Sequence, residues 1–515
     1  GTGALVNGNV GLQAGDDTFM LAGSLSRITG VVDGGTGVDA AFLSGILDTD
    51  RIVGFEAISL GQSAALTVSG NRSLTGNVTF DGVVRFGLGV DSLSVSGDVL
   101  LAEGAVIEIA TPLDNDLVGQ TVTVIAETGT FNDAGAQIVI LDNDLLINYV
   151  PQFGSLSVAV NAFSPLAGSN DSNIAAFSNA IAGGVTAGTI GTANFDALNA
   201  IGDIGTFEQS LVSGLPALND GTAREIFETS NVAAQALNRH LAGEGSRLWG
   251  QIVARGADQD ARALSAVGYD SDQLVFTAGF DLGVGETLRV GVLGSYADID
   301  TTDLYSGTAS GTAQTESYKI GGYLGARFAG RGFINAEASY LTGQTEALRS
   351  GFLGTIASTT DFDGYTAQAT VGYDLLPDEN VRIVPAIGVN YASISFDDTR
   401  ESGGFGFLIA QEDAEFVELR GGIELGAALE GGVDAFISGT VIRDLEDDAS
   451  IVVLSSSQLP TFNVALPARS ADRFELAAGA AVNILQNFAL ELGYLGDFNE
   501  GYSAHSGRVK VRFAF

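Results

Sequence analysis

Residues 247–515 show a repeated alternation of apolar and polar positions. The alternation has a period of two, which predicts β-strands with one face against an apolar medium and the other against water. Twelve such segments follow one another, and the last ends at Phe515. In that last segment Val509, Val511, Phe513 and Phe515 share one face, and basic residues lie mainly on the other. The pattern predicts an antiparallel, membrane-spanning β-barrel, because the strands of such barrels alternate between lipid-facing and lumen-facing side chains.

The connections between these segments alternate in length. Short connections lie near 283–285, 330–331, 377–380, 431–432 and 486, and longer polar ones lie near 258–270, 300–312, 346–361, 397–413 and 444–472. Outer-membrane barrels have short periplasmic turns and longer outer loops. We therefore expect the start and the end of the barrel region on the periplasmic side.

Charged residues occupy the polar face of several segments. In a barrel that face borders a wet lumen, where a charge avoids the cost of contact with lipid. The lumen-facing candidates are Lys319, Arg327, Glu337, Glu418, Arg420, Glu424, Arg473, Glu491, Lys510 and Arg512.

Residues 1–163 consist of short β-rich runs separated by Gly, Asn and Asp. Such recurring runs predict a stacked β-solenoid. The repeat is degenerate, so periodicity alone leaves a β-sandwich open as the alternative. β-Branched residues are denser over about 97–163, which we interpret as a cap on this region.

Residues 164–246 change character, because Ala, Asn and Ser dominate and the spacing of apolar residues becomes helical. Residues 222–241 are predicted to form one helix, which Asp220 or Thr222 could cap, with Glu225 as the capping-box partner of Thr222. Gly243 and Gly245 are expected to end it. The chain is therefore predicted to be all-β with a helical linker.

Composition narrows the class of protein. The 515 residues carry a net charge of −39, which argues against binding to nucleic acid through phosphate neutralisation. The chain contains no stretch of about 20 apolar residues, so no transmembrane helix is predicted. The mean hydropathy is nevertheless positive, at +0.26. Cysteine is absent, so no disulfide framework is expected. No export signal is visible after Gly1, and we expect a mature form or a fragment.

Candidate chemistry is sparse. The two histidines, His240 and His505, have no convincing nucleophile and acid partners for a catalytic triad. We predict no catalytic residues, no enzyme activity in this stretch and no cofactor. The segment Gly34–Phe42 approximates a calcium-binding nonapeptide, which makes Asp17 and Asp39 weak calcium candidates. A single copy favours ordinary solenoid turns, and no metal site is predicted.

The layout resembles the monomeric autotransporters of the type V secretion pathway. The resemblance rests on the strand Arg508–Phe515, on the count of twelve segments, and on the sequence Arg247-Leu248-Trp249-Gly250-Gln251 directly after a helix. It spans nearly the whole chain. It implies a β-helical passenger at 1–163 with an autochaperone at about 97–163, a linker at 164–246, and a twelve-stranded outer-membrane barrel at 247–515.

The resemblance also implies a pore helix at 222–241. Its candidate residues are Arg224, Glu225, Glu228, Asn231, Asn238 and Arg239. Some members of the family cut themselves at an Asn-Asn pair in this helix. Here the two asparagines are single, so self-cleavage by that route is not expected.

The function implied is transport and anchoring: the barrel exports its own passenger, and the helix then plugs the lumen. Val509, Val511, Phe513 and Phe515 would form the signal that the barrel-assembly machinery reads. The partners implied are outer-membrane lipid, lipopolysaccharide, that machinery, periplasmic chaperones, and a host or cell-surface ligand of the passenger, with no nucleic acid. The alternatives are a surface adhesin with a retained β-helical passenger, a simple porin, and a passenger enzyme upstream of Gly1. The helix before the barrel argues against the porin.

Overall fold

The computed structural model describes most of the chain. The described residues are 3–23, 26–44, 46–48, 52–112, 116–142, 144–217, 221–240, 247–304, 310–328, 331–376, 380–429, 431–446 and 450–515; for 46–48 and 233–240 the description covers the backbone only. The chain divides into two compact units, of which one is mainly residues 1–165 and the other contains 205–515. The helical region between them is shared, since 181–190 and 198–204 belong to the first unit and 166–180 and 191–197 to the second.

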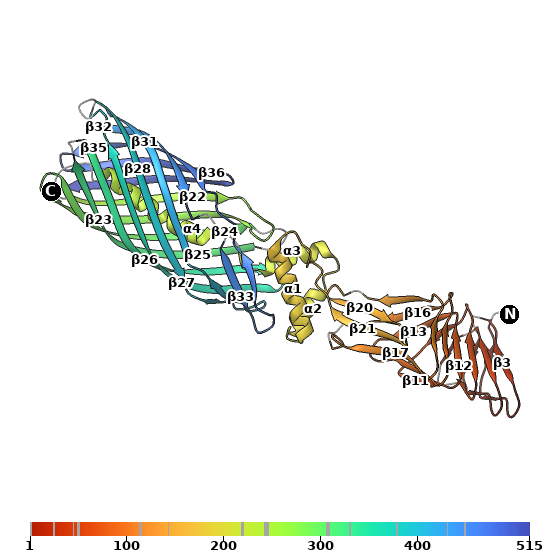
Figure 1. Ribbon diagram of the computed structural model, residues 1–515. Coiled ribbons are helices and arrows are strands. Elements are labelled where there is room, and N and C mark those ends of the chain that lie inside the picture. The colour runs from red at the N-terminus through yellow and green to blue at the C-terminus, as the bar shows by residue number, and fades with distance from the viewer. Residues whose placement is uncertain are drawn as a thin grey trace. The chain divides into compact units, whose positions relative to one another are not determined.

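The N-terminal unit is built from short parallel strands (Figure 1, red to orange). Its strands are β1 (Leu5–Val6), β2 (Val10–Gly11), β3 (Thr18–Leu21), β4 (Arg27–Ile28), β5 (Val32–Asp33), β6 (Ala40–Leu43), β7 (Ile46–Asp48), β8 (Ile52–Val53), β9 (Ala57–Leu60), β10 (Ala65–Thr67), β11 (Asn71–Leu74), β12 (Asn77–Phe80), β13 (Val83–Gly87), β14 (Ser92–Val95), β15 (Val99–Leu101), β16 (Val106–Ala110), β17 (Thr121–Glu127), β18 (Phe131–Asp133), β19 (Gln137–Leu141), β20 (Ile147–Gln152) and β21 (Leu156–Ala162).

Pairing in this unit advances by three strands at a time. One sheet has the order β18-β15-β12-β9-β6-β3, and a second has the order β19-β16-β13-β10-β7. Each turn of the chain therefore contributes one strand to each of three faces, which is the architecture of a β-helix. Val78 lies between Ile58 and Val99 on neighbouring coils, and all three side chains are buried. The stacked aliphatic columns form the core and decide in favour of a solenoid over a sandwich.

The last strands of the unit break the parallel pattern. β21 pairs antiparallel with both β17 and β20. Antiparallel pairing closes the open end of the parallel stack, which would otherwise present unpaired backbone groups. These strands lie within the region of dense β-branched residues at about 97–163.

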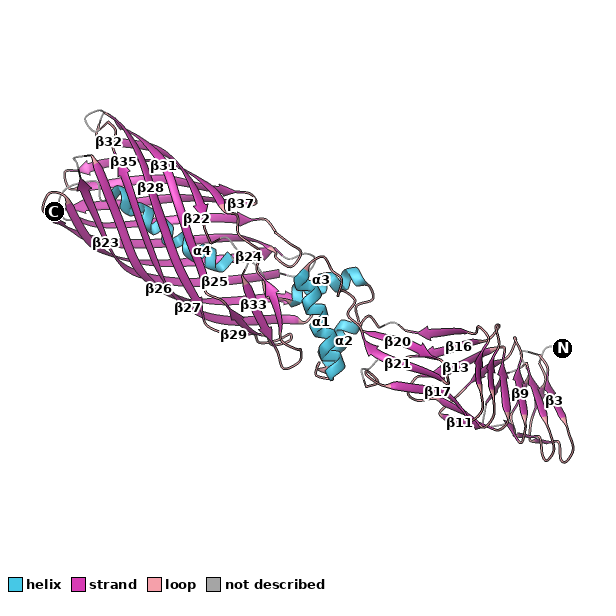
Figure 2. Ribbon diagram, in the orientation of Figure 1, coloured by secondary structure: helices cyan, strands magenta, loops and turns pink. Residues whose placement is uncertain are grey.

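Four helices follow, shown in cyan in Figure 2. They are α1 (Ser172–Ala187), α2 (Thr192–Asn199), α3 (Ile204–Gly214) and α4 (Gly221–His240). Among the described residues, none of the helices is both long enough and apolar enough to cross a membrane. The predicted helix at 222–241 corresponds to α4 within one residue at each end.

The C-terminal region is a closed antiparallel barrel of twelve strands. Its strands are β22 (Arg247–Gln259), β23 (Gly268–Val284), β24 (Leu288–Leu304), β25 (Ser310–Phe328), β26 (Gly332–Gly351), β27 (Gly354–Tyr373), β28 (Val381–Phe396), β31 (Ala414–Leu429), β32 (Val433–Asp444), β35 (Asp472–Leu485), β36 (Phe488–Asn499) and β37 (Tyr502–Ala514). β22 pairs with β37 and closes the barrel, so no strand edge is left unpaired. The twelve-strand prediction is confirmed.

The longer connections are more ordered than their polar composition indicates. The predicted loop at 346–361 is a continuation of β26 and β27, whose pairing runs without a break to Gly351 and Gly354. Two other long connections contain β29 (Thr399–Arg400), β30 (Leu408–Gln411), β33 (Ile451–Ser455) and β34 (Phe462–Ala465). These four strands form a separate sheet in the order β29-β30-β33-β34. The polar composition of these connections therefore does not reflect a loss of strand pairing, and one face of the separate sheet is packed, since Val452, Leu454 and Val464 are buried.

Candidate functional site

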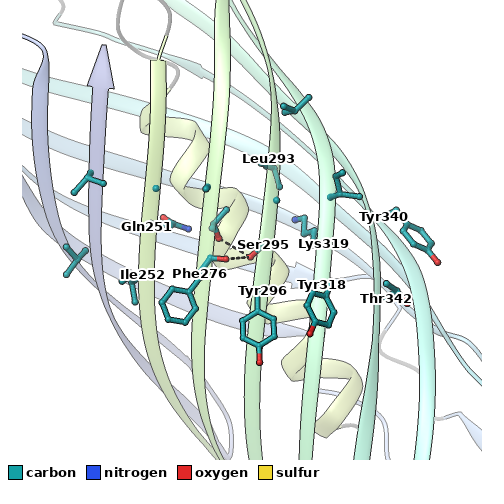
Figure 3. A pocket seen from close by; sticks show the side chains of 18 residues that line it. Gln251, Ile252, Phe276, Leu293, Ser295, Tyr296, Tyr318, Lys319, Tyr340 and Thr342 are labelled. Carbon is teal, nitrogen blue, oxygen red and sulfur yellow. Dashed lines mark hydrogen bonds between the residues drawn. The ribbon is translucent and has the colours of Figure 1, made fainter. Parts of the chain in front are cut away.

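The outer face of the barrel is apolar and aromatic. Tyr318 and Ile320 on β25 are 50% and 67% exposed, whereas Lys319 between them is 8% exposed and faces the lumen. Figure 3 shows Phe276, Tyr296 and Tyr318 side by side on the outside of neighbouring strands, where they line a shallow groove of about 1030 Å³. This alternation gives the barrel an outer surface suited to lipid and an inner surface suited to charge.

The final strand follows the same rule. Val509, Val511, Phe513 and Phe515 are all exposed on the outer face. The ring of Phe515 stacks on Phe280 of β23, with ring centroids 6.0 Å apart. The four residues predicted as an assembly signal therefore form one apolar stripe on the outside of the barrel.

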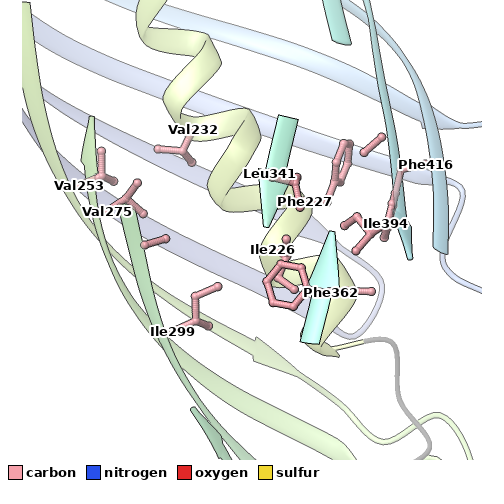
Figure 4. Close-up of a cluster of buried hydrophobic side chains, with 13 residues drawn as sticks. Ile226, Phe227, Val232, Val253, Val275, Ile299, Leu341, Phe362, Ile394 and Phe416 are labelled. Atoms are coloured by element: carbon pink, nitrogen blue, oxygen red, sulfur yellow. The ribbon is translucent and has the colours of Figure 1, made fainter. Parts of the chain in front are cut away.

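Helix α4 lies inside the barrel, against the inner face of its wall (Figure 4). Its Ile226, Phe227 and Val232 are buried against apolar side chains that point inward from the strands. Phe227 stacks on Phe416 with ring centroids 4.5 Å apart and ring planes 12° apart. The strand residues of this cluster are Val253, Val275, Ala297, Ile299, Leu341, Phe362, Ala392, Ile394 and Phe416. Burying a side chain of this size contributes about 1.5–3 kcal/mol.

Glu225 anchors the first turns of α4 to the barrel wall. Its fully buried carboxylate accepts hydrogen bonds from Arg255 and Gln273, and also from the hydroxyls of Tyr269 at 3.2 Å and Tyr502 at 3.3 Å. The predicted capping-box role of Glu225 is wrong, because these strand residues occupy its carboxylate. The charge-assisted hydrogen bond that the Glu225 carboxylate accepts from Arg255 is stronger than the one it could accept from a backbone N–H at the helix end.

A second polar cluster surrounds Arg473 of β35. Its guanidinium lies 2.5 Å from Glu228 of α4 and 2.5 Å from Asp497, and it also contacts Glu418. Arg420 pairs with Glu418 at 3.4 Å and extends the cluster to Glu475. All of these groups except the half-buried Arg420 are almost completely removed from water, so each depends on its partners for compensation of its charge.

Further polar side chains of the barrel wall form hydrogen bonds with the next turn of α4. Lys319 donates to the hydroxyl of Ser230 at 2.8 Å and pairs with Glu337 at 2.6 Å. The amide nitrogen of Asn390 donates to the side-chain oxygen of Asn231 at 3.1 Å. The described part of α4 is thus held by apolar contacts on one side and by polar contacts on the others.

The predicted lumen-facing residues divide by depth. Lys319, Glu337, Glu418, Arg473 and Lys510 are buried inside the barrel. Arg420, Glu424, Glu491 and Arg512 are half-buried, and Arg327 is exposed at the end of β25 on the same inward-facing side of the strand. Of the helix candidates, Arg224, Glu225, Glu228 and Asn231 are buried, and the side chains of Asn238 and Arg239 lie outside the described residues.

Several residues of these clusters were not predicted from the sequence. They are Arg255, Tyr269, Gln273, Glu475, Asp497 and Tyr502. The sequence does place these residues on the polar faces of their strands. It does not predict their proximity to α4, because that depends on the rotation and depth of the helix in the lumen.

The outer loops of the barrel hold the linker that precedes α4. The carboxylate of Asp171 accepts hydrogen bonds from the backbone and hydroxyl of Ser265 at 2.8 and 2.9 Å. The side-chain amide of Asn173 bonds to both the N–H and the C=O of Ala465, at 2.8 and 2.9 Å. The start of α1 is thereby fixed to two separate loops.

An aromatic cluster strengthens this attachment. Phe177 of α1 lies 5.6–5.8 Å, between ring centroids, from Phe405, Phe407 and Phe462. All four rings come from the linker and the outer loops. The cluster joins a chain segment that precedes the barrel to the sheet formed by its loops.

Of the two calcium candidates, Asp39 has a carboxylate that links coils of the β-helix. Asp39 accepts a hydrogen bond from the backbone N–H of Asp17 at 2.7 Å, and Glu56 accepts one from the N–H of Asp39 at 2.7 Å. The carboxylates therefore link successive coils. In the part of the chain that the structure describes, no group of three or more His, Cys, Asp or Glu side chains is arranged to hold a metal ion.

Comparison with known proteins decides what kind of barrel this is. Residues 248–495 match the autotransporter β-domain family, over a range that runs from β22 into β36. The barrel is an autotransporter β-domain. Autotransporter β-domains are translocator domains of the bacterial outer membrane, so the apolar outer face of this barrel contacts lipid.

Individual relatives of this β-domain chain are distant. Outer membrane protein A of Rickettsia conorii is 23% identical over 266 residues, which are 49% of this chain and 13% of that protein. The translocator domain of the autotransporter NalP from Neisseria meningitidis is 17% identical with a TM-score of 0.49, over 57% of this chain and 98% of the other. The transport unit of AIDA-I from Escherichia coli is 16% identical with a TM-score of 0.43, over 53% and 91%.

Proposed function

We propose that the barrel exports the segment N-terminal to α4 across the outer membrane and anchors it at the cell surface, and that α4 remains in the lumen as a plug. In this assignment residues 1–163 are part of the passenger, with an autochaperone cap at about 97–163. Residues 164–246 are the linker that includes the pore helix, and residues 247–515 are the translocator.

The observation that carries the proposal is the match between α4 and the inner wall. Glu225 meets Arg255, and Glu228 meets Arg473, each pair with almost no exposure to water. A buried charge that loses its partner costs about 3–5 kcal/mol, so each pair opposes withdrawal of the helix. A barrel that served as an open porin has no need of paired charges on a helix within it.

We propose that the apolar stripe of Val509, Val511, Phe513 and Phe515 is read by the barrel-assembly machinery. The stripe faces outward on the strand that closes the barrel, and a protein that inserts the barrel into lipid would approach from that side. Periplasmic chaperones and lipopolysaccharide are the further partners of this proposal. We assign no enzyme activity to residues 1–163.

A retained passenger that acts as a surface adhesin is the second candidate. Its support is the attachment of Asp171, Asn173 and Phe177 to the outer loops, because these contacts hold the linker at the barrel mouth. The ligand in that case is a host or neighbouring-cell surface molecule. Release of residues 1–163 into the medium would argue against this candidate.

The direct experiment is single-channel conductance in a planar bilayer, with the chain intact and with residues 222–240 deleted. The proposal predicts an almost silent intact chain and a stable pore after deletion. A large, stable conductance in the intact chain would show that α4 does not plug the lumen.

A further inference from the structure

A ribbon of arginines crosses five consecutive strands at the end of the barrel that carries the short turns. Arg512 of β37, Arg247 of β22, Arg289 of β24 and Arg327 of β25 all occupy inward-facing positions of their strands. We call these four residues the arginine ribbon. The strand between them, β23, contributes Asp281.

The strand register places these side chains next to one another. Arg512 pairs with Trp249 and Arg247 pairs with Ala514, so the two arginines are diagonal neighbours on one face. Arg289 pairs with Gly325 and is therefore diagonal to Arg327 on the next strand. On the intervening strand β23, Asp281 lies directly opposite Arg247.

This arrangement opposes the usual rule for neighbouring strands. Like charges on adjacent strands are destabilising, and opposite charges are favoured. Deeper in the lumen the barrel follows the rule, since Arg473 contacts three carboxylates. At this end of the barrel, the described inward-facing positions of the five strands instead hold four arginines and one carboxylate, Asp281. Such a concentration of like charge would be favourable in the presence of an anionic group, which points to a role in binding one.

A buried platform holds the ribbon in place. Asp281 accepts hydrogen bonds from Arg289 at 2.5 Å and from the hydroxyl of Tyr323 at 3.2 Å, and Trp249 donates to the same hydroxyl at 2.9 Å. Gly279 leaves the space that the Trp249 ring fills, since a Cβ there would lie 2.5 Å from the ring. The platform fixes the direction of the Arg289 side chain, which lies at the centre of its network.

The chemistry of the anion follows from the rest of the chain. Residues 1–163 contain 18 Asp and Glu, four Arg and no Lys. Both lysines of the chain, Lys319 and Lys510, lie inside the barrel. The segment proposed as passenger is thus strongly acidic, and it would pass the four arginines of the ribbon as it enters the lumen.

We propose that the arginine ribbon is an electrostatic threading site that draws the unfolded, acidic passenger into the lumen from the periplasmic side. This inference rests on the proposed function, and it names acidic polypeptide as the substrate class of the pore. A lumen lined by one sign of charge and surrounded by a low-dielectric wall raises the local concentration of an oppositely charged chain, typically by about 10- to 1,000-fold. No nucleotide is available at the outer membrane to drive transport. Electrostatic attraction at the first step of threading would therefore directly increase the rate at which the passenger enters the lumen.

The test is the rate at which the passenger reaches the cell surface, measured by pulse labelling and protease accessibility on intact cells that express the full-length protein. The rate is counted per folded barrel, which heat-modifiable migration on gels reports separately. The variants are Arg327→Gln with Arg512→Gln, the same pair changed to Glu, and the same pair changed to Lys. The matched control is Arg400→Gln with Arg443→Gln, which removes two exposed charges near the opposite end of the barrel.

The proposal predicts that the Gln pair slows surface exposure about 3- to 10-fold, that the Glu pair slows it further, and that the Lys pair and the control match the unaltered protein. Equal rates per folded barrel in all variants would overturn the threading site and leave export intact. A passenger that never reaches the surface, even in the unaltered protein with a folded barrel, would overturn the proposed function itself.

Discussion

Removal of the Glu225 carboxylate is the substitution that probes the plug most sharply. In Glu225→Ala the helix loses its contacts with Arg255 and Gln273, and the Arg255 guanidinium, 5% exposed, loses its compensating charge. Breaking a buried pair in this way costs about 3–5 kcal/mol. Since about 1.4 kcal/mol corresponds to a factor of ten, the population with α4 out of the lumen should rise roughly 10²- to 4 × 10³-fold.

The assay is the fraction of time that single channels spend open in a planar bilayer. Glu286→Ala is the matched control, because this glutamate is exposed in the short turn between β23 and β24. The double variant Glu225→Ala with Arg255→Ala should recover part of the closure, because it removes the uncompensated cation as well. An open fraction for Glu225→Ala equal to that of the control would show that paired charges do not hold the helix in the lumen.

Three further outcomes are expected. Phe177→Ala should loosen the linker by about 3–5 kcal/mol, because it deletes the centre of the aromatic cluster, and limited proteolysis should then cut the linker faster. Deletion of Phe515 should lower the fraction of folded, heat-modifiable barrel, because the ring completes the outer apolar stripe and stacks on Phe280. The backbone N–H and the hydroxyl of Thr130 hold the pKa of Asp98 below its ordinary value of 3.8, so Asp98 stabilises the N-terminal β-helix above that value and loses this effect as the pH falls through its folded pKa. Thr130→Val should therefore weaken the acid sensitivity of hydrogen exchange near this contact, measured at about pH 5 and about pH 3.

The barrel could be predicted because each strand has lipid on one side and a polar lumen on the other, which requires apolar and polar residues to alternate along it. Val509 and Val511 had to face lipid, and Lys510 between them had to face the lumen. The rule weakened where the lumen itself is packed. Ile442 falls on the polar face of its strand and is fully buried inside, paired with Arg420 and Arg473 of the two neighbouring strands.

The remaining features depend on contacts that are distant in sequence. Glu225 fitted a capping box by local spacing, yet Arg255, 30 residues away, takes its carboxylate. The loop at 346–361 is polar, and polar composition does not distinguish a loop from a strand hairpin that stands in water. The arginine ribbon could not be predicted from the sequence either, because its members are brought together only by the register of five strands.

Protease accessibility of residues 1–163 on intact cells, with and without residues 247–515, decides whether the barrel exports the passenger. We expect the passenger to be cut from outside only when the barrel is present and folded, and to stay protected in the periplasm without it. A passenger that reaches the surface equally well in the absence of the barrel would contradict export through the barrel.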